Sequence, residues 1–542
     1  MKNYLHSLFA EAATRLDYLN GIKLTFDIPK SPEHGDYSSN APMILAKNLK
    51  KAPRLIAQDI VANLKTDSHI ISKIEIAGNG FINFFFTPLF LSKLVSEIIE
   101  KNGDFGKSTS YSGKKANVEF VSANPTGPLT VGHGRNAVCG DTIANLLEWV
   151  GYTVDREYYF NNAGRQMRIL GDSVKKRYLE ILGDNVEFPD DYYQGQYINL
   201  IAQKIYEKYG DTLRDEDPEG IFKSTAEQEI FLEIKNSLAN LDINHKIFYN
   251  ENDLYTEGKI QALINSFEEK SLSYKKEGAV WLKLTEMGNE ADKVIVKSTG
   301  EPTYRLPDIA YHIVKLDRAY DLLIDIFGSD HTATYPDVLA ALNNLGYDSG
   351  KVKVIIHQFV TVIKDGEIVK MSTRKANYIT LDELTEEVGK DAVRYFFNMR
   401  NLNSHMNFDL NLAKEKSEEN PVFYVQYAHA RISSIIRMAQ DNNIAPSLQD
   451  LGLLSSEDEI RLLKILNLFK EEVLLAATNC DPQRITAYVE ELAKAFHKFY
   501  TTCRIIGVEK NLSSARLTLI NAVRIVLANG LSILGVSAPD KM

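Results

Sequence analysis

Residues 117–135 read Asn-Val-Glu-Phe-Val-Ser-Ala-Asn-Pro-Thr-Gly-Pro-Leu-Thr-Val-Gly-His-Gly-Arg, and they contain a strand that turns into a helix. The first six residues are rich in β-branched and aromatic side chains and predict a buried strand over 117–122. The Pro-Thr-Gly-Pro segment at 125–128 ends that strand. From residue 136 onward, apolar residues at 143, 146, 147 and 150 follow the spacing of a helix. Gly132-His133-Gly134 is therefore expected at a strand-to-helix turn.

A turn of this kind is suited to phosphate groups. The first turn of a helix offers unpaired N–H groups and the positive end of the helix dipole, and glycines let a ligand approach the backbone. His133 can donate a hydrogen bond to a phosphate oxygen, which helps most as charge builds up in a transition state. The alternative is an ordinary strand-to-helix turn with a solvated histidine.

A second segment adds fixed positive charge. The sequence predicts a buried strand over 352–356 and a hairpin over 360–370 that turns at Asp365-Gly366. The loop Lys370-Met371-Ser372-Thr373-Arg374 follows, and Thr380 with Glu383 forms a capping box that opens the next helix. A lone basic loop is usually a solvated surface. Downstream of a Gly-His-Gly turn, it predicts a site that holds the triphosphate of ATP from two sides.

The two segments resemble the two signature motifs of class I aminoacyl-tRNA synthetases, and the long form of the first resembles the arginyl-tRNA synthetase family. The resemblance extends over nearly the whole chain. It includes 35–40 (Gly-Asp-Tyr-Ser-Ser-Asn), 78–83 (Gly-Asn-Gly-Phe-Ile-Asn), 156–164, 304–312, 425–431 and the closing 535–542.

The sequence departs from the family pattern at two positions. Thr130 stands where the first signature usually begins with His, and a hydroxyl can bond a phosphate but cannot carry charge. Ala376 stands where the family usually has Gly, which is expected to stiffen the second loop. Both departures bear on the rate more than on the reaction.

The resemblance implies roles for particular residues. Catalytic roles fall to His133, Lys370 and Thr130, and no metal-ligating residues are expected. The residues expected to bind ATP are Gly132, His133, Gly134, Asp330, Lys370, Met371, Ser372 and Arg374. Mg²⁺ is expected to accompany ATP, which is a substrate.

Selectivity for arginine calls for carboxylates, because a guanidinium is best recognised by planar, bidentate acceptors. Glu119 lies in a mostly apolar strand, where a carboxylate needs a partner. Asp308 follows Tyr304 by four residues, so on a helix the two face the same way. The family resemblance implies that Glu119, Tyr304 and Asp308 hold the guanidinium, and that Asn124 and His331 orient the α-amino and carboxylate end. His312 and His429 are expected to be structural.

The residues implied to contact tRNA lie at the two ends of the chain. Exposed aromatic and cationic side chains of a helical bundle can stack on splayed anticodon bases. Gln426, Tyr427, Arg431, Tyr500 and Met542 are expected near the anticodon, and Phe81 and Asn83 near the elbow of the tRNA. For each of these residues, a place in the protein core is the alternative.

The composition agrees with a large enzyme. The 542 residues suggest about three domains, and 44% hydrophobic and 25% charged residues are typical of globular proteins. Cys139, Cys480 and Cys503 are scattered, which suggests a reducing compartment and offers no zinc site. The net charge of −10 does not favour nucleic-acid binding, although basic faces can exist on an acidic protein. We expect a cytoplasmic monomer without a membrane partner.

The fold class follows from the order of the predicted elements. Residues 1–105 predict an N-terminal α+β domain. Residues 106–405 alternate strands and helices and predict a Rossmann-type α/β domain with a parallel sheet and an insertion at about 170–290. Residues 406–542 show only helical periodicity and predict an α-helical bundle for anticodon binding.

The expected function is an arginine–tRNA ligase acting in translation. It forms arginyl-adenylate from L-arginine and ATP, transfers the arginyl group to the terminal adenosine of tRNA(Arg), and releases AMP and pyrophosphate. Two alternatives remain open at this point. One is another class I synthetase or a nucleotidyltransferase with the same turn. The other is a catalytically silent tRNA-binding relative, which only Thr130 suggests.

Overall fold

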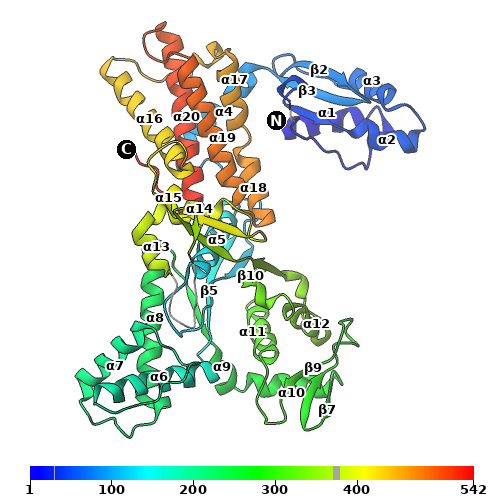
Figure 1. Ribbon diagram of the computed structural model, residues 1–542. Coiled ribbons are helices and arrows are strands. Elements are labelled where there is room, and N and C mark those ends of the chain that lie inside the picture. The colour runs from blue at the N-terminus through cyan, green and yellow to red at the C-terminus, as the bar shows by residue number, and fades with distance from the viewer. Residues whose placement is uncertain (30, 163, 370–378) are drawn as a thin grey trace.

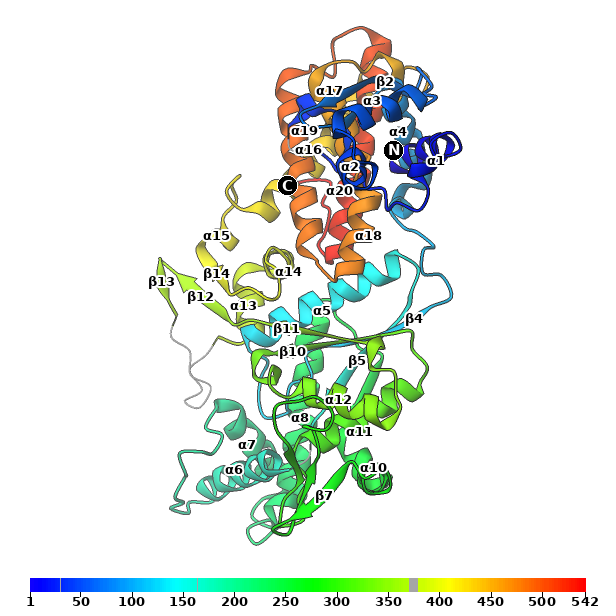
Figure 2. The ribbon, with the colours of Figure 1, turned by 90° about the vertical axis from the view of Figure 1, so that its right-hand side faces the viewer.

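The computed structural model describes residues 1–29, 31–162, 164–369 and 379–542. A helical bundle lies at one end of an elongated molecule, a parallel sheet lies in the middle, and an elaborated segment lies at the other end (Figure 1). The N-terminal domain stands beside the bundle, and the second view shows the sheet between the two ends (Figure 2). The predicted fold class is confirmed.

The central sheet has five parallel strands in the order β11-β10-β4-β5-β6. The strands are β4 (Lys115–Glu119), β5 (Thr153–Phe160), β6 (Ile247–Asn250), β10 (Leu322–Gly328) and β11 (Val352–His357). The chain proceeds from β4 to one side and later returns to place β10 on the other side. Ligands of such open sheets bind at the carboxyl ends of the strands, where this order reverses. The point of reversal here lies between β4 and β10.

The turn after β4 differs in detail from the prediction. The strand ends at Glu119, not Ser122, because Val121 and Ser122 have φ of 68° and 40°. The left-handed region is rare for a β-branched residue, so the chain leaves the sheet abruptly. Helix α5 (Val131–Trp149) begins before the first apolar repeat, because Thr130 caps it.

The segment between β5 and β10 contains most of the elaborated end of the molecule. Its helices are α6 (Arg165–Ile181), α7 (Gln196–Tyr209), α8 (Lys223–Asn240), α9 (Glu251–Thr256), α10 (Lys259–Glu269) and α11 (Arg305–Asp317). A small antiparallel sheet contains β7 (Ser273–Lys276), β8 (Ala279–Leu282) and β9 (Lys293–Val296). Strand β6 lies within the range 170–290 and yet pairs with β5 in the central sheet. Helix α12 (Tyr335–Leu345) joins β10 to β11.

The predicted hairpin is present as β12 (Val360–Lys364) and β13 (Glu367–Ile368). Asp365 and Gly366 both have positive φ, 54° and 78°, as a tight hairpin turn requires. The chain continues through α13 (Leu381–Val388), α14 (Lys390–Asn398), β14 (Met406–Asp409) and α15 (Leu410–Lys414). Strand β14 pairs with β12 in parallel, so the hairpin is fixed to the rest of the domain.

The N-terminal domain is a three-stranded sheet covered by helices. Its elements are α1 (Lys2–Ala13), β1 (Tyr37–Ser39), α2 (Ala41–Leu49), α3 (Pro53–Asn63), β2 (Ile71–Ala77) and β3 (Phe81–Phe86), and α4 (Pro88–Lys101) follows. Strands β2 and β3 form an antiparallel pair. Strand β1 was not predicted, because three residues carry too short a pattern.

The C-terminal part is the predicted helical bundle. Its helices are α16 (Pro421–Asp441), α17 (Glu457–Leu466), α18 (Phe469–Asn479), α19 (Gln483–Thr502) and α20 (Lys510–Leu534). Residues 457–479 form two helices rather than one continuous helix. The Asn467 side chain between them donates to the Leu463 carbonyl at 2.8 Å. Helix α20 is apolar and long enough to span a membrane, but 78% of its most apolar window is buried among the other helices.

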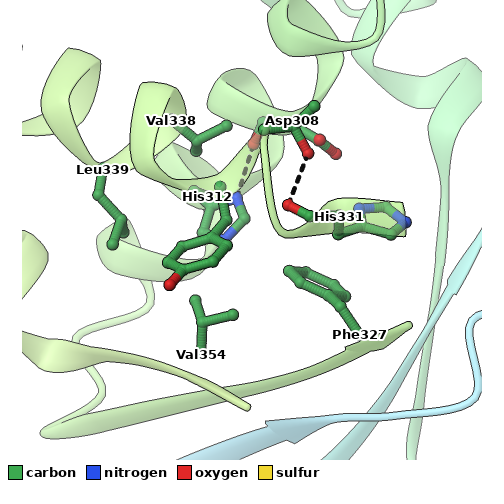
Figure 3. Close-up of a pocket in the computed structure, with 9 residues that line it drawn as sticks. Asp308, His312, Phe327, His331, Val338, Leu339 and Val354 are labelled. Atoms are coloured by element: carbon green, nitrogen blue, oxygen red, sulfur yellow. Dashed lines mark hydrogen bonds between the residues drawn. The ribbon is translucent and has the colours of Figure 1, made fainter. Parts of the chain in front are cut away.

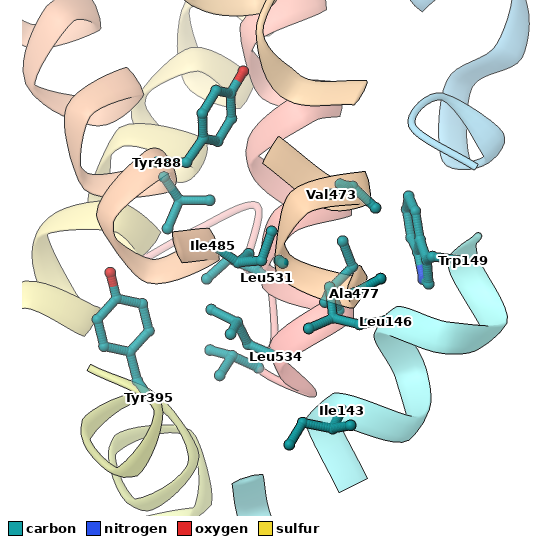
Figure 4. Packing of buried hydrophobic residues seen from close by; sticks show 14 of the residues in the cluster. Ile143, Leu146, Trp149, Tyr395, Val473, Ala477, Ile485, Tyr488, Leu531 and Leu534 are labelled. Atoms are coloured by element: carbon teal, nitrogen blue, oxygen red, sulfur yellow. The ribbon is translucent and has the colours of Figure 1, made fainter. Parts of the chain in front are cut away.

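The bundle packs directly on the helix that carries the Gly-His-Gly turn. Ile143, Leu146 and Trp149 of α5 face Val473 and Ala477 of α18 and Leu531 and Leu534 of α20 (Figure 4). The buried Arg394 of α14 adds polar contacts at this junction. Its guanidinium donates to Asp141 of α5 at 2.6 Å and to the carbonyls of Leu534 and Leu241. The far end of α5 is thereby fixed, and its N-terminus is left at the carboxyl edge of the sheet.

Candidate active site

The N-terminus of α5 is organised by a reciprocal capping box. The Thr130 hydroxyl accepts from the His133 backbone N–H, and the Nδ1 atom of His133 accepts from the Thr130 backbone N–H at 3.1 Å. Burial, and to a lesser extent the nearby His357, lowers the pKa of His133 to about 4. The ring is therefore neutral near pH 7, with its proton on Nε2. His133 can donate that proton in a hydrogen bond without carrying a charge.

The second loop is joined to this turn at its downstream end. Thr130 and Thr380 form an antiparallel bridge, and the Leu381 N–H donates to the Leu129 carbonyl at 2.8 Å. A Cβ at Gly134 would lie 2.5 Å from Leu381, so glycine is needed for this close approach. The predicted capping box of Thr380 and Glu383 is confirmed. The predicted residues Lys370, Met371, Ser372 and Arg374, like Ala376, lie outside the described residues.

A row of three carboxylates crosses the sheet at the same level. Asp325 of β10 pairs in register with Glu119 of β4, which pairs in register with Glu157 of β5. Residues in register on parallel strands point to the same face. All three are at most 3% exposed. Two cations of the α11 segment oppose them: Lys315 contacts Glu119 and Asp325, and Arg318 contacts both oxygens of Glu157 at 2.8 and 2.7 Å.

Asp308 and His331 line a small pocket beside this row. Phe327, His312 and the apolar side chains of Val338, Leu339 and Val354 complete most of its wall (Figure 3). Burial raises the pKa of Asp308, while His312 and His331 oppose that rise. His331 stacks on Phe327 with ring centroids 4.8 Å apart. Glu119 and Asp308 share Lys315, Asp325 and His312 as electrostatic neighbours, so the structure brings the two predicted carboxylates to one place.

The other predicted amino-acid contacts are more exposed. Tyr304 is the N-cap of α11 and is 78% exposed, so its ring does not share the buried environment of Asp308. Asn124 is exposed, and its amide donates to Gln166 at 2.7 Å. Asp330 lies in the short 3-10 helix Ser329–His331, and its side chain is outside the described part of the chain. The roles expected of these residues stay predictions.

Sequence reasoning missed several groups at this site. His312, expected to be structural, bonds the Asp308 carbonyl through Nδ1 at 2.7 Å and Asp325 through Nε2 at 3.0 Å. Asp308, His312 and Lys315 are spaced i, i+4, i+7, so they lie on one face of the helix. This spacing does not show which other element of the fold that face contacts. Glu251 begins α9 and is 8% exposed. Burial, together with nearby Asp308, raises the pKa of Glu251 to about 7.

The residues predicted to contact tRNA fall into two groups by exposure. Half-buried Tyr427 and Arg431 and exposed Tyr500 form one cluster, in which Arg431 donates to both phenol oxygens and lies 4.7 Å from the Tyr500 ring centroid. Met542 and Phe81 are 56% and 42% exposed. Gln426 and Asn83 are buried.

The amide of Gln426 is already committed within the protein. It donates to Asp391 of α14 and to Ser537 after α20, so it joins the bundle to the catalytic domain. A contact between Gln426 and a base would require these bonds to be exchanged.

Three protein-family models match successive parts of this chain, and together they cover almost all of it. Residues 3–86 match "Arginyl tRNA synthetase N terminal domain", 94–435 match "tRNA synthetases class I (R), catalytic domain", and 425–542 match "DALR anticodon binding domain". The chain is 48% identical to the arginine–tRNA ligase of Chlorobium phaeovibrioides and 47% identical to that of Salinibacter ruber, with all of both chains covered in each case. This chain belongs to the arginine–tRNA ligase family.

Solved structures agree on the fold. The Thermus thermophilus arginyl-tRNA synthetase superposes with a TM-score of 0.78 at 21% identity over all of both chains. The Plasmodium falciparum enzyme gives 0.75 at 18% identity over 100% of this chain and 99% of that one. The arginine–tRNA ligase family is a class I aminoacyl-tRNA synthetase family, so the predicted family, fold class and enzyme class are all confirmed.

Proposed function

We propose that this ligase binds L-arginine between Glu119 and Asp308 and MgATP between the N-terminus of α5 and the loop 370–374. The observation that carries the proposal is that buried Glu119 and half-buried Asp308 share Lys315, Asp325 and His312 as electrostatic neighbours, beside the point where the strand order reverses. Two carboxylates brought together in this way suit a guanidinium, which offers planar, charge-assisted donors. The neutral, donating His133 lies at the same edge of the sheet.

The reaction then follows in two steps. A carboxylate oxygen of arginine attacks the α-phosphorus of ATP, the bond to the β-phosphate oxygen breaks, and pyrophosphate leaves. A 2′- or 3′-hydroxyl of the terminal adenosine next attacks the activated carbonyl, and AMP leaves. The protein positions the reactants and stabilises the developing charge. His133 donates through Nε2, the α5 N-terminus supplies N–H groups, and Lys370 and Arg374 neutralise the leaving pyrophosphate.

Positioning roles complete the site. Thr130 caps α5 and holds His133 in place. The absence of side chains at Gly132 and Gly134 lets the phosphates approach the backbone, and at Gly134 it also makes room for Leu381. Met371, Ser372 and Asp330 complete the proposed nucleotide contacts. Tyr304, Asn124 and His331 complete the proposed contacts with arginine, and the exposed side chains of Tyr304 and Asn124 are accessible to it.

The tRNA contacts are proposed for the cluster of Tyr427, Arg431 and Tyr500 and its surroundings. Stacking on bases is supported by the exposed Tyr500 ring and by Arg431, which lies over that ring. Gln426, Met542, Phe81 and Asn83 complete the proposed contacts. The proposed units are 1–105, 106–405 with the insertion at 170–290, and 406–542, in a cytoplasmic monomer.

The direct test is aminoacylation with total tRNA and each amino acid in turn. Arginine alone should become acid-precipitable, and the activity should require ATP and Mg²⁺. His133→Gln should lose most of the rate, whereas the exposed His405→Gln is the matched control and should not. Charging with another amino acid would identify a different class I synthetase. Binding of tRNA without any charging would identify a silent relative.

A further inference from the structure

Lys315 is a lysine with no exposure at all, in the middle of the sheet–helix interface. Its Nζ lies 2.7 Å from Glu119 Oε2 and also bonds Asp325 Oδ1. Lysine is almost never fully buried unless it is paired, and its four-carbon chain normally lets the ammonium reach water. A well-packed apolar residue could join α11 to the sheet at least as well as a buried ion pair. Stability alone therefore does not explain why a lysine occupies this buried position.

The carboxylates around Lys315 give another reason. Arg318 bonds both oxygens of Glu157, and Asp325 bonds His312 as well as Lys315. Among the described residues, Glu119 has no cation of its own, because it shares Lys315 with Asp325. Its Oε2 accepts from Lys315, and its Oε1 accepts from Ser122 Oγ at 3.0 Å. A carboxylate can accept about four hydrogen bonds, so both oxygens can still receive a donor.

We propose that Lys315 is a positioning residue of the amino-acid site, which holds the Glu119 carboxylate charged and correctly directed for the guanidinium of arginine. The inference rests on the proposed function, because it takes Glu119 as an acceptor for the substrate. Lys315 touches neither substrate; it acts through Glu119. Arg318 forms an ion pair with the neighbouring Glu157, and in the described part of the chain it has no bond to Glu119.

The electrostatic surroundings of Glu119 determine what the loss of Lys315 should do. The groups that face Glu119 are Lys315, His312 and Tyr311 of α11, Asp325 of β10 and Tyr159 of β5. Burial raises the pKa of Glu119, Lys315 lowers it, and Asp325 raises it. Without the ammonium, burial and Asp325 act with less opposition. Glu119 should then take up a proton at higher pH and lose its affinity for a cation.

The experiment compares Lys315→Met with Arg318→Met by aminoacylation of total tRNA between pH 6 and 8.5. Lys315→Met should raise the KM for arginine by roughly tenfold or more, the scale of one lost charge-assisted partner. That KM should climb further as the pH falls, while the KM for ATP stays at the wild-type value. Arg318→Met also removes one cation beside an in-register carboxylate, but its arginine KM should follow the wild-type pH profile.

Two further variants keep the test decisive if Lys315→Met does not fold. Lys315→Met with Asp325→Asn preserves the net charge and still isolates Glu119, so the pH-dependent KM should persist. Lys315→Arg keeps a cation beside Glu119, so its arginine KM should follow the wild-type pH profile.

The outcomes separate this inference from the proposed function. If folded Lys315→Met, or the double variant, gives an arginine KM with the wild-type pH profile, Lys315 is only a structural brace. The same conclusion follows if Arg318→Met shifts the KM equally. A wild-type protein that charges tRNA with an amino acid other than arginine overturns the proposed function, and this inference with it.

Discussion

The Nδ1 atom of His133 accepts a hydrogen bond from the backbone N–H of Thr130, three residues before it. In most capping boxes a Glu or Gln side chain makes this contact; here the imidazole does so and is thereby fixed in one tautomer. The residue that replaces the usual first histidine of the signature thus positions the second. The departure at Thr130 becomes a feature of the helix cap.

Replacement of Thr130 tests this arrangement. Thr130→Val removes the capping hydroxyl, which should cost about 1 kcal/mol of stability and lower the rate of adenylate formation. Thr130→His should be tolerated. Single-turnover kinetics and thermal unfolding measure the two effects. A Val variant with the full activation rate would mean that Thr130 only fills space.

The buried imidazole should also make stability depend on pH. The pKa of His133 is about 4 in the folded protein, against an ordinary value of 6.5. The unfolded chain therefore binds a proton more readily, and stability is lost as the pH falls from about 6.5 towards 4. His133→Gln should lose less stability over that range. Urea midpoints at pH 7.5 and 5 would show it, and equal losses in both proteins would contradict the assignment.

The second loop should act on the transition state for activation. Lys370→Ala removes a cation from the developing pyrophosphate charge and should slow adenylate formation by roughly 10²-fold or more. Arginine binding should be nearly unchanged. Lys364→Ala, on the neighbouring strand β12, is the matched control and should keep the wild-type rate. Wild-type single-turnover kinetics in the Lys370 variant would remove the loop from the mechanism.

Substrate choice should depend on the two converging carboxylates. Asp308→Asn and Glu119→Gln keep the shape but remove a charge, and each should weaken arginine binding by about 1.5–3 kcal/mol. Their effects should be non-additive, because both acids meet one cation. Discrimination against citrulline, the neutral isostere, should shrink in both. The exposed Asp317→Asn on α11 is the control.

Wild-type arginine kinetics and full rejection of citrulline in both carboxylate variants would mean that other groups read the guanidinium.

Glu251 should make the folded protein less stable as the pH rises. Burial raises its pKa to about 7 from an ordinary 4.5. The folded state then holds the proton more tightly, so this contribution is complete below about 4.5 and is lost as the pH rises through about 7. Glu251→Gln mimics the protonated form and should unfold at a higher temperature than wild type at pH 8. A larger gain at pH 5 than at pH 8 would contradict the sign.

The sequence predicts a structural feature correctly where a short local pattern of residues is typical of one structure. The Asp365-Gly366 turn, the Thr380–Glu383 cap and the parallel sheet could all be predicted from local pattern. The partner of Glu119 could not. Lys315 lies nearly two hundred positions further along the chain, and only the packing of α11 on β4 and β10 brings it there. Likewise Gln426 shares a helix with half-buried Tyr427 and Arg431, and periodicity alone does not predict that its amide bonds Ser537.

The bridge between Thr130 and Thr380 determines how far the cations of the second loop can be from the nucleotide. Arg374 is six residues before Thr380, and six residues span at most about 22 Å. Lys370 directly follows Val369, whose N–H is bonded to the Val362 carbonyl at 2.9 Å. On the proposed function, this chain length limits how far Arg374 can lie from the helix proposed to receive the phosphates. A cation tethered in this way would meet ATP at the high effective concentration of an intramolecular partner, on the order of millimolar for a short linker.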